Sequence, residues 1–341
     1  AHLWMQLSHA GRQTPFSINK ESRAPSVQPL PTLGGVLKFG VPKELSQSEI
    51  LNIIDQFVNA AEVAKQTGFT GVQLHSAHGY LLSEFLSPNV NQRTDEWGGS
   101  IENRSRLLMT TIEAIREKVG SNFPISIKLN SSDFQKGGFS HEESIEVAKI
   151  LNNTSLDLLE ISGGTYENFT ALEIDSLNLK KAKTIKPQRS TKVREAYFLK
   201  YAEAIKEVIS IPLAVTGGFR STEGMNHALQ SGACDVIGLG RPLCSEPDIV
   251  NELISGEKKS ATLYENMLEF GPWILGLNSP ISLMRSNNKA AQVYWCYRQI
   301  LKIADGNEVD TNLGLFKAFL DHFRDDSANS KKYKAFWKDL D

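Results

Sequence analysis

Short apolar segments alternate with amphipathic helical patterns over most of this sequence, and this alternation restricts the fold more than any other feature. The apolar segments cover residues 3–7, 71–75, 124–129, 157–161, 211–215 and 235–239. Helical patterns cover residues 48–66, 100–118, 141–152 and 221–230, and a long basic loop leads into a further helix around residues 192–209. Strands that alternate with helices in this way are typical of parallel sheets. The sequence therefore predicts an α/β fold.

The number of strands bears on the type of α/β fold. No Gly-x-Gly-x-x-Gly motif follows any of the strands, which disfavours a Rossmann domain. We find six strands, whereas a closed (β/α)8 TIM barrel has eight. We therefore expect an N-terminally incomplete barrel, with two βα units, on the order of 60 residues, before Ala1. Periodicity alone leaves a doubly wound α/β sheet open as the alternative.

The charge balance restricts the kind of partner. The 341 residues carry 37 Lys and Arg against 39 Asp and Glu, a formal net charge of −2. Such a chain has no overall positive field for nucleic acid or an anionic membrane, so we expect a small-molecule partner. Three widely spaced cysteines fit neither a disulfide framework nor C-x-x-C metal pairs. With no apolar run near the roughly 18 residues of a membrane span and no leader pattern, we expect a cytoplasmic protein.

Polar side chains gather where the predicted strands end. His75, His78 and Tyr80 follow the second strand, and Lys128 lies near the end of the third. Glycines and arginines follow the last two strands, as Gly217-Gly218-Phe219-Arg220 and Gly240-Arg241. In a barrel the carboxyl ends of the strands form the face on which active sites are built. The sequence therefore predicts a site at this face.

Four ordered motifs resemble those of the Old Yellow Enzyme family. They are Gln6-Leu-x-His-Ala-Gly-Arg12, His75-x-x-His-Gly-Tyr80, the segment 93–104 (RTDEWGGSIENR) and Gly238-Leu-Gly-Arg-Pro242. The resemblance covers residues 1 to about 260. It implies a (β/α)8 barrel that holds FMN noncovalently, with NAD(P)H and an α,β-unsaturated carbonyl compound acting in turn at the flavin.

The resemblance also implies catalytic roles. His75 and His78 would bind the substrate carbonyl oxygen, where negative charge grows as the C=C bond is reduced, and Tyr80 would protonate the carbon next to the carbonyl. The alternative for each residue taken singly is a core histidine or an ordinary loop aromatic. A zinc site is less favoured, because the two histidines lack the carboxylate and the helical spacing of H-E-x-x-H. We therefore expect no metal.

A second group of residues is expected to bind the flavin. Glycines let backbone N–H groups approach an anion closely, so Gly217, Gly218, Gly240 and Arg241 are predicted to hold the FMN phosphate. Gln6 matches the family's glutamine at the flavin pyrimidine. Lys128 lies at the position where most family members have an arginine beside the flavin. Lysine keeps the positive charge but cannot make the two parallel hydrogen bonds of a guanidinium. The alternative for the glycines is that they are needed only for tight turns with positive φ. The alternative for Gln6 is that it is an ordinary strand residue whose side chain bonds to the backbone of the barrel.

These features predict an NAD(P)H-dependent FMN ene-reductase. An FMN barrel with another acceptor, and a barrel remnant that binds without turnover, remain as alternatives. We expect the oxidoreductase domain to cover residues 1–260 and a helical extension to cover 261–341, packed on the barrel or on a second copy. In the extension we expect one apolar face at Val293, Tyr297, Ile300 and Leu301.

Overall fold

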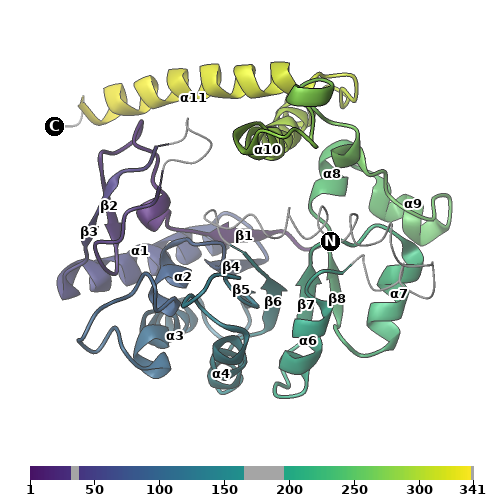
Figure 1. Cartoon of the computed structure of the whole chain (residues 1–341). Helices are drawn as coiled ribbons and strands as arrows, with labels where there is room; N and C mark the ends of the chain where they lie inside the picture. Colours follow the sequence, from purple (N-terminus) through teal and green to yellow (C-terminus); the bar gives the residue numbers. More distant parts are fainter. Residues whose placement is uncertain (32–37, 165–195, 339–341) are drawn as a thin grey trace.

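The computed structural model describes residues 1–31, 38–164 and 196–338. The run of lysines and arginines between Lys180 and Arg194, which precedes the predicted helix at 192–209, lies outside the described residues. A six-stranded sheet forms the centre of the molecule, in the order β1-β4-β5-β6-β7-β8 (Figure 1). Its strands are β1 (Trp4–Leu7), β4 (Gly71–Ser76), β5 (Ile125–Asn130), β6 (Leu158–Ser162), β7 (Leu213–Thr216) and β8 (Val236–Gly238). All five pairings are parallel.

The strand order separates the two α/β folds that the sequence left open. A doubly wound sheet reverses its order at a switch point, whereas the strands of a barrel follow one another around a ring. Here each strand of the main sheet pairs with the next one along the chain, and the sheet is curled into half a barrel (Figure 1). Within the described residues, β1 and β8 are its two edges. The prediction of an incomplete TIM barrel with a helical C-terminal extension is confirmed.

Helices cover the outer side of the curled sheet, and their starts follow from the sequence. They are α1 (Gln47–Gln66), α3 (Ile101–Val119), α4 (His141–Leu151), α6 (Leu199–Lys206) and α7 (Thr222–Gln230). Ser46 and Glu49 form a capping box on α1, as Ser140 and Glu143 do on α4, so the free backbone N–H groups of the first turn are satisfied. Ser100 caps α3, where its side chain accepts a hydrogen bond from the backbone nitrogen of Asn103.

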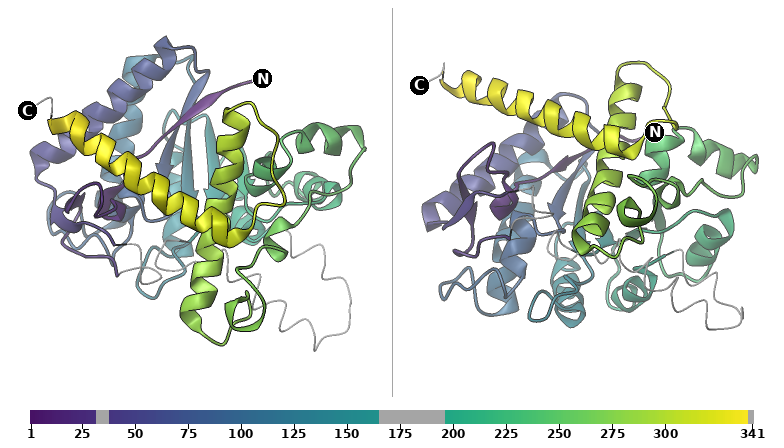
Figure 2. Two further views of the ribbon diagram at one scale, coloured as in Figure 1. Left: turned by 90° about the horizontal axis from the view of Figure 1, so that it is seen from above. Right: turned by 45° about the horizontal axis from the view of Figure 1, so that its top comes forward.

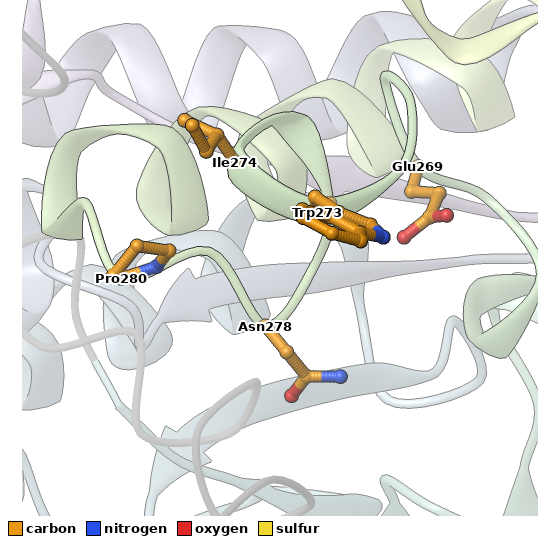
Figure 3. A pocket seen from close by; sticks show the side chains of 6 residues that line it. Glu269, Trp273, Ile274, Asn278 and Pro280 are labelled. Atoms are coloured by element: carbon orange, nitrogen blue, oxygen red, sulfur yellow. The ribbon is translucent and has the colours of Figure 1, made fainter.

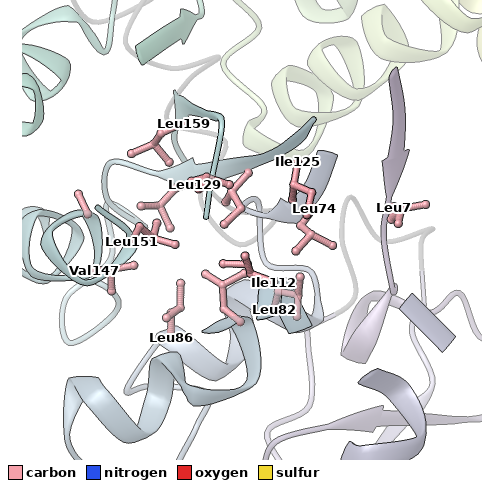
Figure 4. Close-up of a cluster of buried hydrophobic side chains, with 14 of the residues drawn as sticks. Leu7, Leu74, Leu82, Leu86, Ile112, Ile125, Leu129, Val147, Leu151 and Leu159 are labelled. Carbon is pink, nitrogen blue, oxygen red and sulfur yellow. The ribbon is translucent and has the colours of Figure 1, made fainter. Parts of the chain in front are cut away.

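The core lies between these helices and the sheet. Leu74, Leu82, Ile112, Ile125 and Leu129 are among its fully or almost fully buried members (Figure 4). Burying one such side chain contributes about 1.5–3 kcal/mol. This one cluster runs from β1 to β7, so the strand ends that carry the predicted site are held by a shared core.

Two strands and a helix within residues 21–86 were not predicted. The strands β2 (Glu21–Ala24) and β3 (Val41–Glu44) pair in parallel within a stretch that reads from its prolines and serines as loop. The helix α2 (Leu81–Leu86) directly follows Tyr80. β2 and β3 lack the apolar runs that mark the strands of the main sheet, because most of their residues are polar or charged. The six residues of α2 make fewer than two helical turns, which is too short to show a helical period.

The extension is helical as predicted, but its buried face differs from the expected one. After α8 (Arg241–Ser245) and α9 (Ile249–Ser255) come α10 (Ser282–Ala304) and α11 (Leu315–Lys338). The predicted face of α10 is exposed, since Tyr297 and Leu301 are 53% and 50% exposed. The buried face consists of Asn288, Ala291, Gln292, Trp295 and Gln299. The side-chain amides of Asn288, Gln292 and Gln299 donate hydrogen bonds to backbone oxygens of neighbouring segments. The prediction was based on apolar residues alone, and it therefore missed this largely polar buried face.

The helix α11 runs across the molecule toward the segment that follows β1 (Figures 1 and 2). Ser330 on this helix donates a hydrogen bond to the backbone oxygen of Ser17 at 2.6 Å. No helix in the described residues is long and apolar enough to cross a membrane.

Candidate active site

The parallel sheet brings the predicted site residues to one edge. His75 and Lys128 lie side by side near the carboxyl ends of β4 and β5, as their register pairing shows. Gly217 and Gly218 directly follow β7, and Gly240 and Arg241 follow β8. Because all these strands point the same way, the loops that follow them emerge on the same rim of the half barrel.

The three aromatic side chains predicted to be catalytic form a cluster. The ring centroids of His75 and His78 are 5.0 Å apart, and those of His75 and Tyr80 are 4.8 Å apart. The backbone of the loop is held in place, because His78 N donates to Asn130 Oδ1 at 3.1 Å and Gln13 Nε2 donates to the oxygen of His78 at 2.9 Å. His78 has a φ of 62°, a conformation that is uncommon for residues other than glycine. Together these contacts turn the two imidazoles toward one another.

Both histidines are neutral at physiological pH. Desolvation, with smaller effects from His78 and Lys128, lowers the pKa of His75 to about 3. Desolvation and the charge of Lys128 lower the pKa of His78 to about 4, although Glu160 acts in the opposite direction. A neutral imidazole has one N–H donor and one acceptor nitrogen. The cluster can therefore donate hydrogen bonds to an oxygen without adding a full positive charge.

The hydrogen bonds of the ring cluster leave one buried nitrogen without a partner. The ring nitrogens His78 Nδ1 and His75 Nε2 are 3.4 Å apart, and His78 Nε2 lies 2.8 Å from Ser162 Oγ. The Nδ1 atom of His75 is buried and has no hydrogen-bond partner among the described residues. A buried polar atom of this kind is costly unless another group satisfies it. It is a candidate position for a ligand oxygen.

A polar network on the inner face of the sheet links Gln6 to Lys128. Gln6 Nε2 donates to Gln73 Oε1 at 2.6 Å, and Gln73 Nε2 donates to Glu160 Oε2 at 2.7 Å. Lys128 Nζ lies 3.1 Å from Glu160 Oε1, to which Thr216 also donates. Gln73 and Glu160 were not predicted to belong to the site. A charged residue in the middle of a predicted buried strand is the signal that could have found Glu160.

The glycine and arginine loops form a separate cluster. Gly217 and Gly218 have φ values of 136° and 90°, and a Cβ added to Gly217 would lie 2.8 Å from the ring of Phe198. Both the turn and the packing against Phe198 therefore require glycine at position 217, as the alternative of a tight turn also expects. Gly240 has a φ of −111°, and an added Cβ would meet nothing within 4 Å. Arg241 beside it is paired with Glu265, with Nη1 and Oε1 3.3 Å apart.

Three hollows that described residues line lie away from the ring cluster. The hollow in Figure 3, of about 410 Å³, lies in the extension and is lined by Glu269, Trp273, Ile274, Gly276, Asn278 and Pro280. None of these residues was predicted to belong to the site. Gln6 lines a hollow of about 350 Å³ with residues of α1, and Arg241 lines a smaller one of about 100 Å³ with residues of α10.

The described residues contain no group of three or more His, Cys, Asp and Glu side chains that could hold a metal ion. The loop of segment 93–104 is held by ion pairs. Arg93 pairs with Asp95, and Arg104 pairs with Glu143 on α4. These ion pairs help to fix the conformation of the loop.

Comparisons with known proteins give a consistent result. The model of the NADH:flavin oxidoreductase / NADH oxidase family matches residues 1–260. A NADH-dependent flavin oxidoreductase of Aspergillus parasiticus is 41% identical over 259 residues, which cover 76% of this chain and 55% of that protein. A cinnamate reductase of Clostridium sporogenes is 33% identical over 270 residues, covering 74% of this chain and 38% of that protein.

The solved structures agree with these sequence relatives. The old yellow enzyme homologue from Zymomonas mobilis aligns with a TM-score of 0.61 and 26% sequence identity, over 82% of this chain and 74% of that one. The chain spans about half the length of the Aspergillus relative and about two fifths of the clostridial one.

Proposed function

The chain belongs to the NADH:flavin oxidoreductase / NADH oxidase family, whose cofactor is FMN, and from this premise we propose that it is an NAD(P)H-dependent ene-reductase. In the proposed reaction, hydride from reduced nicotinamide reaches the β-carbon of an α,β-unsaturated carbonyl compound by way of bound FMN. The observation that supports this most directly is the cluster of two neutral imidazoles and a phenol at the end of β4. A cinnamate reductase among the relatives supports the same substrate class.

The donor set of the site fits the chemistry of FMN. The flavin ring has polar atoms along its pyrimidine edge, and Gln6 and Lys128 supply an amide and a cation that one carboxylate network connects. The phosphate needs cations and open backbone, and Arg241 and Gly240 supply these after β8. FMN would supply the ring that accepts hydride from nicotinamide and passes it to the substrate.

The ring cluster would act on the substrate in two ways. His75 and His78 would donate hydrogen bonds to the carbonyl oxygen. The buried Nδ1 of His75, which has no hydrogen-bond partner among the described residues, supports this role for His75. His78 would have to give up its contact with His75 or Ser162 to take part. Donors placed where negative charge develops lower the barrier most. The Tyr80 hydroxyl would then give its proton to the α-carbon.

One experiment tests the proposal in two stages. The purified chain is examined for the yellow absorbance of bound FMN, and the flavin is then reduced anaerobically with NADH or NADPH. We expect bleaching by one or both nucleotides and recovery of the yellow colour when 2-cyclohexenone is added. A protein that binds no FMN, or that is reduced but not reoxidised by the enone, contradicts the proposal. In the second case another acceptor is indicated.

A second candidate function rests on the two edges of the sheet. The strands β1 and β8 have no further strand beside them in the described residues, and Gln6 on β1 is exposed. Unpaired strand edges can bind another chain. A barrel that binds a partner without turnover would show no FMN in the first stage of the experiment.

We also propose a setting for this activity. The three free cysteines suit a reducing compartment, so we place the protein in the cytoplasm. We propose that its partners are the nicotinamide and a small enone or quinone-like acceptor. We further propose residues 1–260 as the oxidoreductase domain and 261–341 as an extension, which can also pack on a second copy of the chain.

A further inference from the structure

A carboxylate of the extension lies between the two arginines that follow β7 and β8. Glu265 Oε1 is 2.5 Å from Arg220 Nη2 and 3.3 Å from Arg241 Nη1. Glu265 belongs to a short helical turn, η2 (Tyr264–Asn266), beyond the residues that the family model matches. The extension therefore places a negative charge against the arginine that we propose for the FMN phosphate.

The two ion pairs of Glu265 are unequal. The side chain of Arg220 is 8% exposed, and its Nη1 also donates to the oxygen of Phe219, so it is fixed in place. The side chain of Arg241 is 31% exposed and makes the longer contact. Arg220 and Glu265 thus form the fixed pair, and Arg241 is the member that can exchange partners.

The segment that carries Glu265 is firmly attached on both sides. Gln292 of α10 donates to the backbone oxygens of Glu265 and Leu268, at 2.7 and 3.2 Å. On the other side, the nitrogen of Ala261 donates to the oxygen of Arg220 at 2.9 Å. The Tyr264 ring stacks on Trp295 with centroids 5.8 Å apart. The carboxylate therefore stays near Arg241 when that side chain turns to another anion.

We propose that Glu265 competes with the FMN phosphate for Arg241, so that the extension lowers the affinity for flavins that carry a phosphate. This inference rests on the proposed function. A phosphate monoester carries about −1.5 to −2 charges at pH 7, and it would meet both the occupied guanidinium and the negative charge of Glu265. A flavin without phosphate would meet neither.

The test compares FMN with riboflavin, which has the same ring and no phosphate. The flavin-free protein is titrated with each flavin, and binding is followed by the quenching of flavin fluorescence. We expect Glu265→Gln to bind FMN about tenfold more tightly, or about 1.4 kcal/mol, and riboflavin with unchanged affinity. The exposed Glu257 gives the matched control, because Glu257→Gln removes one negative charge from the region without touching either arginine.

Further variants keep the test decisive. In Arg241→Gln the preference for FMN over riboflavin should be lost, and adding Glu265→Gln to it should give no gain. If Glu265→Gln does not fold, Glu265→Asp, which keeps the charge near Arg220 but withdraws it from Arg241, should show a smaller gain in the same direction. Unchanged or weaker FMN binding, or an equal change for both flavins, overturns the inference alone. A wild-type chain that binds no FMN overturns both this inference and the proposed function.

Discussion

Two clusters of polar side chains lie along the same rim of the half barrel, and they differ in how the sequence builds them. At the end of β4, residues 75–80 alone supply two neutral imidazoles and a phenol. After β7 and β8, Arg220 and Arg241 contact Glu265, which lies 45 residues beyond Arg220. The first cluster is local in sequence and uncharged. The second is assembled from distant segments and depends on charge. The two ends of one parallel edge are thus suited to different tasks, the first to hydrogen bonding and proton transfer and the second to holding an anion.

This difference has a physical basis in the surroundings of each cluster. His75 is 7% exposed, so a charged imidazole at this position would lose its hydration. Arg241 is 31% exposed, and a guanidinium keeps its charge at any ordinary pH. The predictions that follow aim at one cluster while leaving the other unchanged.

The largest effect is expected for Tyr80→Phe. If Tyr80 is the proton donor, the reoxidation of reduced flavin by an enone should slow by about 100- to 10,000-fold, because general acids contribute on that scale. Flavin reduction by the nicotinamide should stay nearly unchanged. Stopped-flow absorbance measures the two half-reactions separately.

Tyr201→Phe serves as the control for that variant. Tyr201 lies on α6 and packs edge-on against His141, away from the ring cluster, so both half-reactions should match those of the wild type. An equal loss in both half-reactions of Tyr80→Phe would rule out the proton-donor role.

The next effect concerns stability and pH. Since the pKa values of His75 and His78 are lowered to about 3 and about 4, the unfolded chain binds protons at these residues below about pH 6.5 while the folded protein does not. The free energy of unfolding should therefore fall as the pH falls from about 6.5 to about 4, by up to about 1.4 kcal/mol per pH unit for each histidine. Urea unfolding at several pH values in this range measures the slope.

The double variant His75→Gln/His78→Asn should show a clearly smaller slope. His227 is exposed on α7, so His227→Asn should keep the slope of the wild type. A double variant with an undiminished slope would show that the two imidazoles are not buried in their neutral form.

The smallest effect is expected at the network between the two clusters. Glu160 compensates the charge of Lys128, so Glu160→Gln should make the midpoint potential of bound FMN more positive by roughly 30 mV, which is a tenfold change for two electrons. Lys128→Met should shift the potential in the opposite direction. Spectroelectrochemical titration measures both, and shifts of the same sign would refute the compensation.

The sequence predicted what is local and periodic. The six strands of the main sheet lie where the apolar segments predicted them, within two residues at each end, and the cluster of His75, His78 and Tyr80 comes from one motif. Parallel pairing then brings the loops after β7 and β8 to the same rim.

Contacts between distant segments could not be read in this way. Nothing in the order of residues shows that Glu265 reaches Arg241, or that Glu160 links Lys128 to Gln73. The buried face of α10 was missed for a related reason. Gln292 and Gln299 are buried because loop carbonyls need donors there, a need that arises only once the loops are folded.

The hydrogen bond from Ser330 to Ser17 joins positions 313 residues apart. The entropy lost on closing a loop grows only slowly, by about 0.6 kcal/mol for each doubling of its length, but one hydrogen bond contributes only about 1 kcal/mol. The contact between Ser330 and Ser17 therefore adds little stability by itself, and it should form late in folding. Amide hydrogens near Ser330 and in the segment after β1 should consequently exchange together, as parts of one opening event.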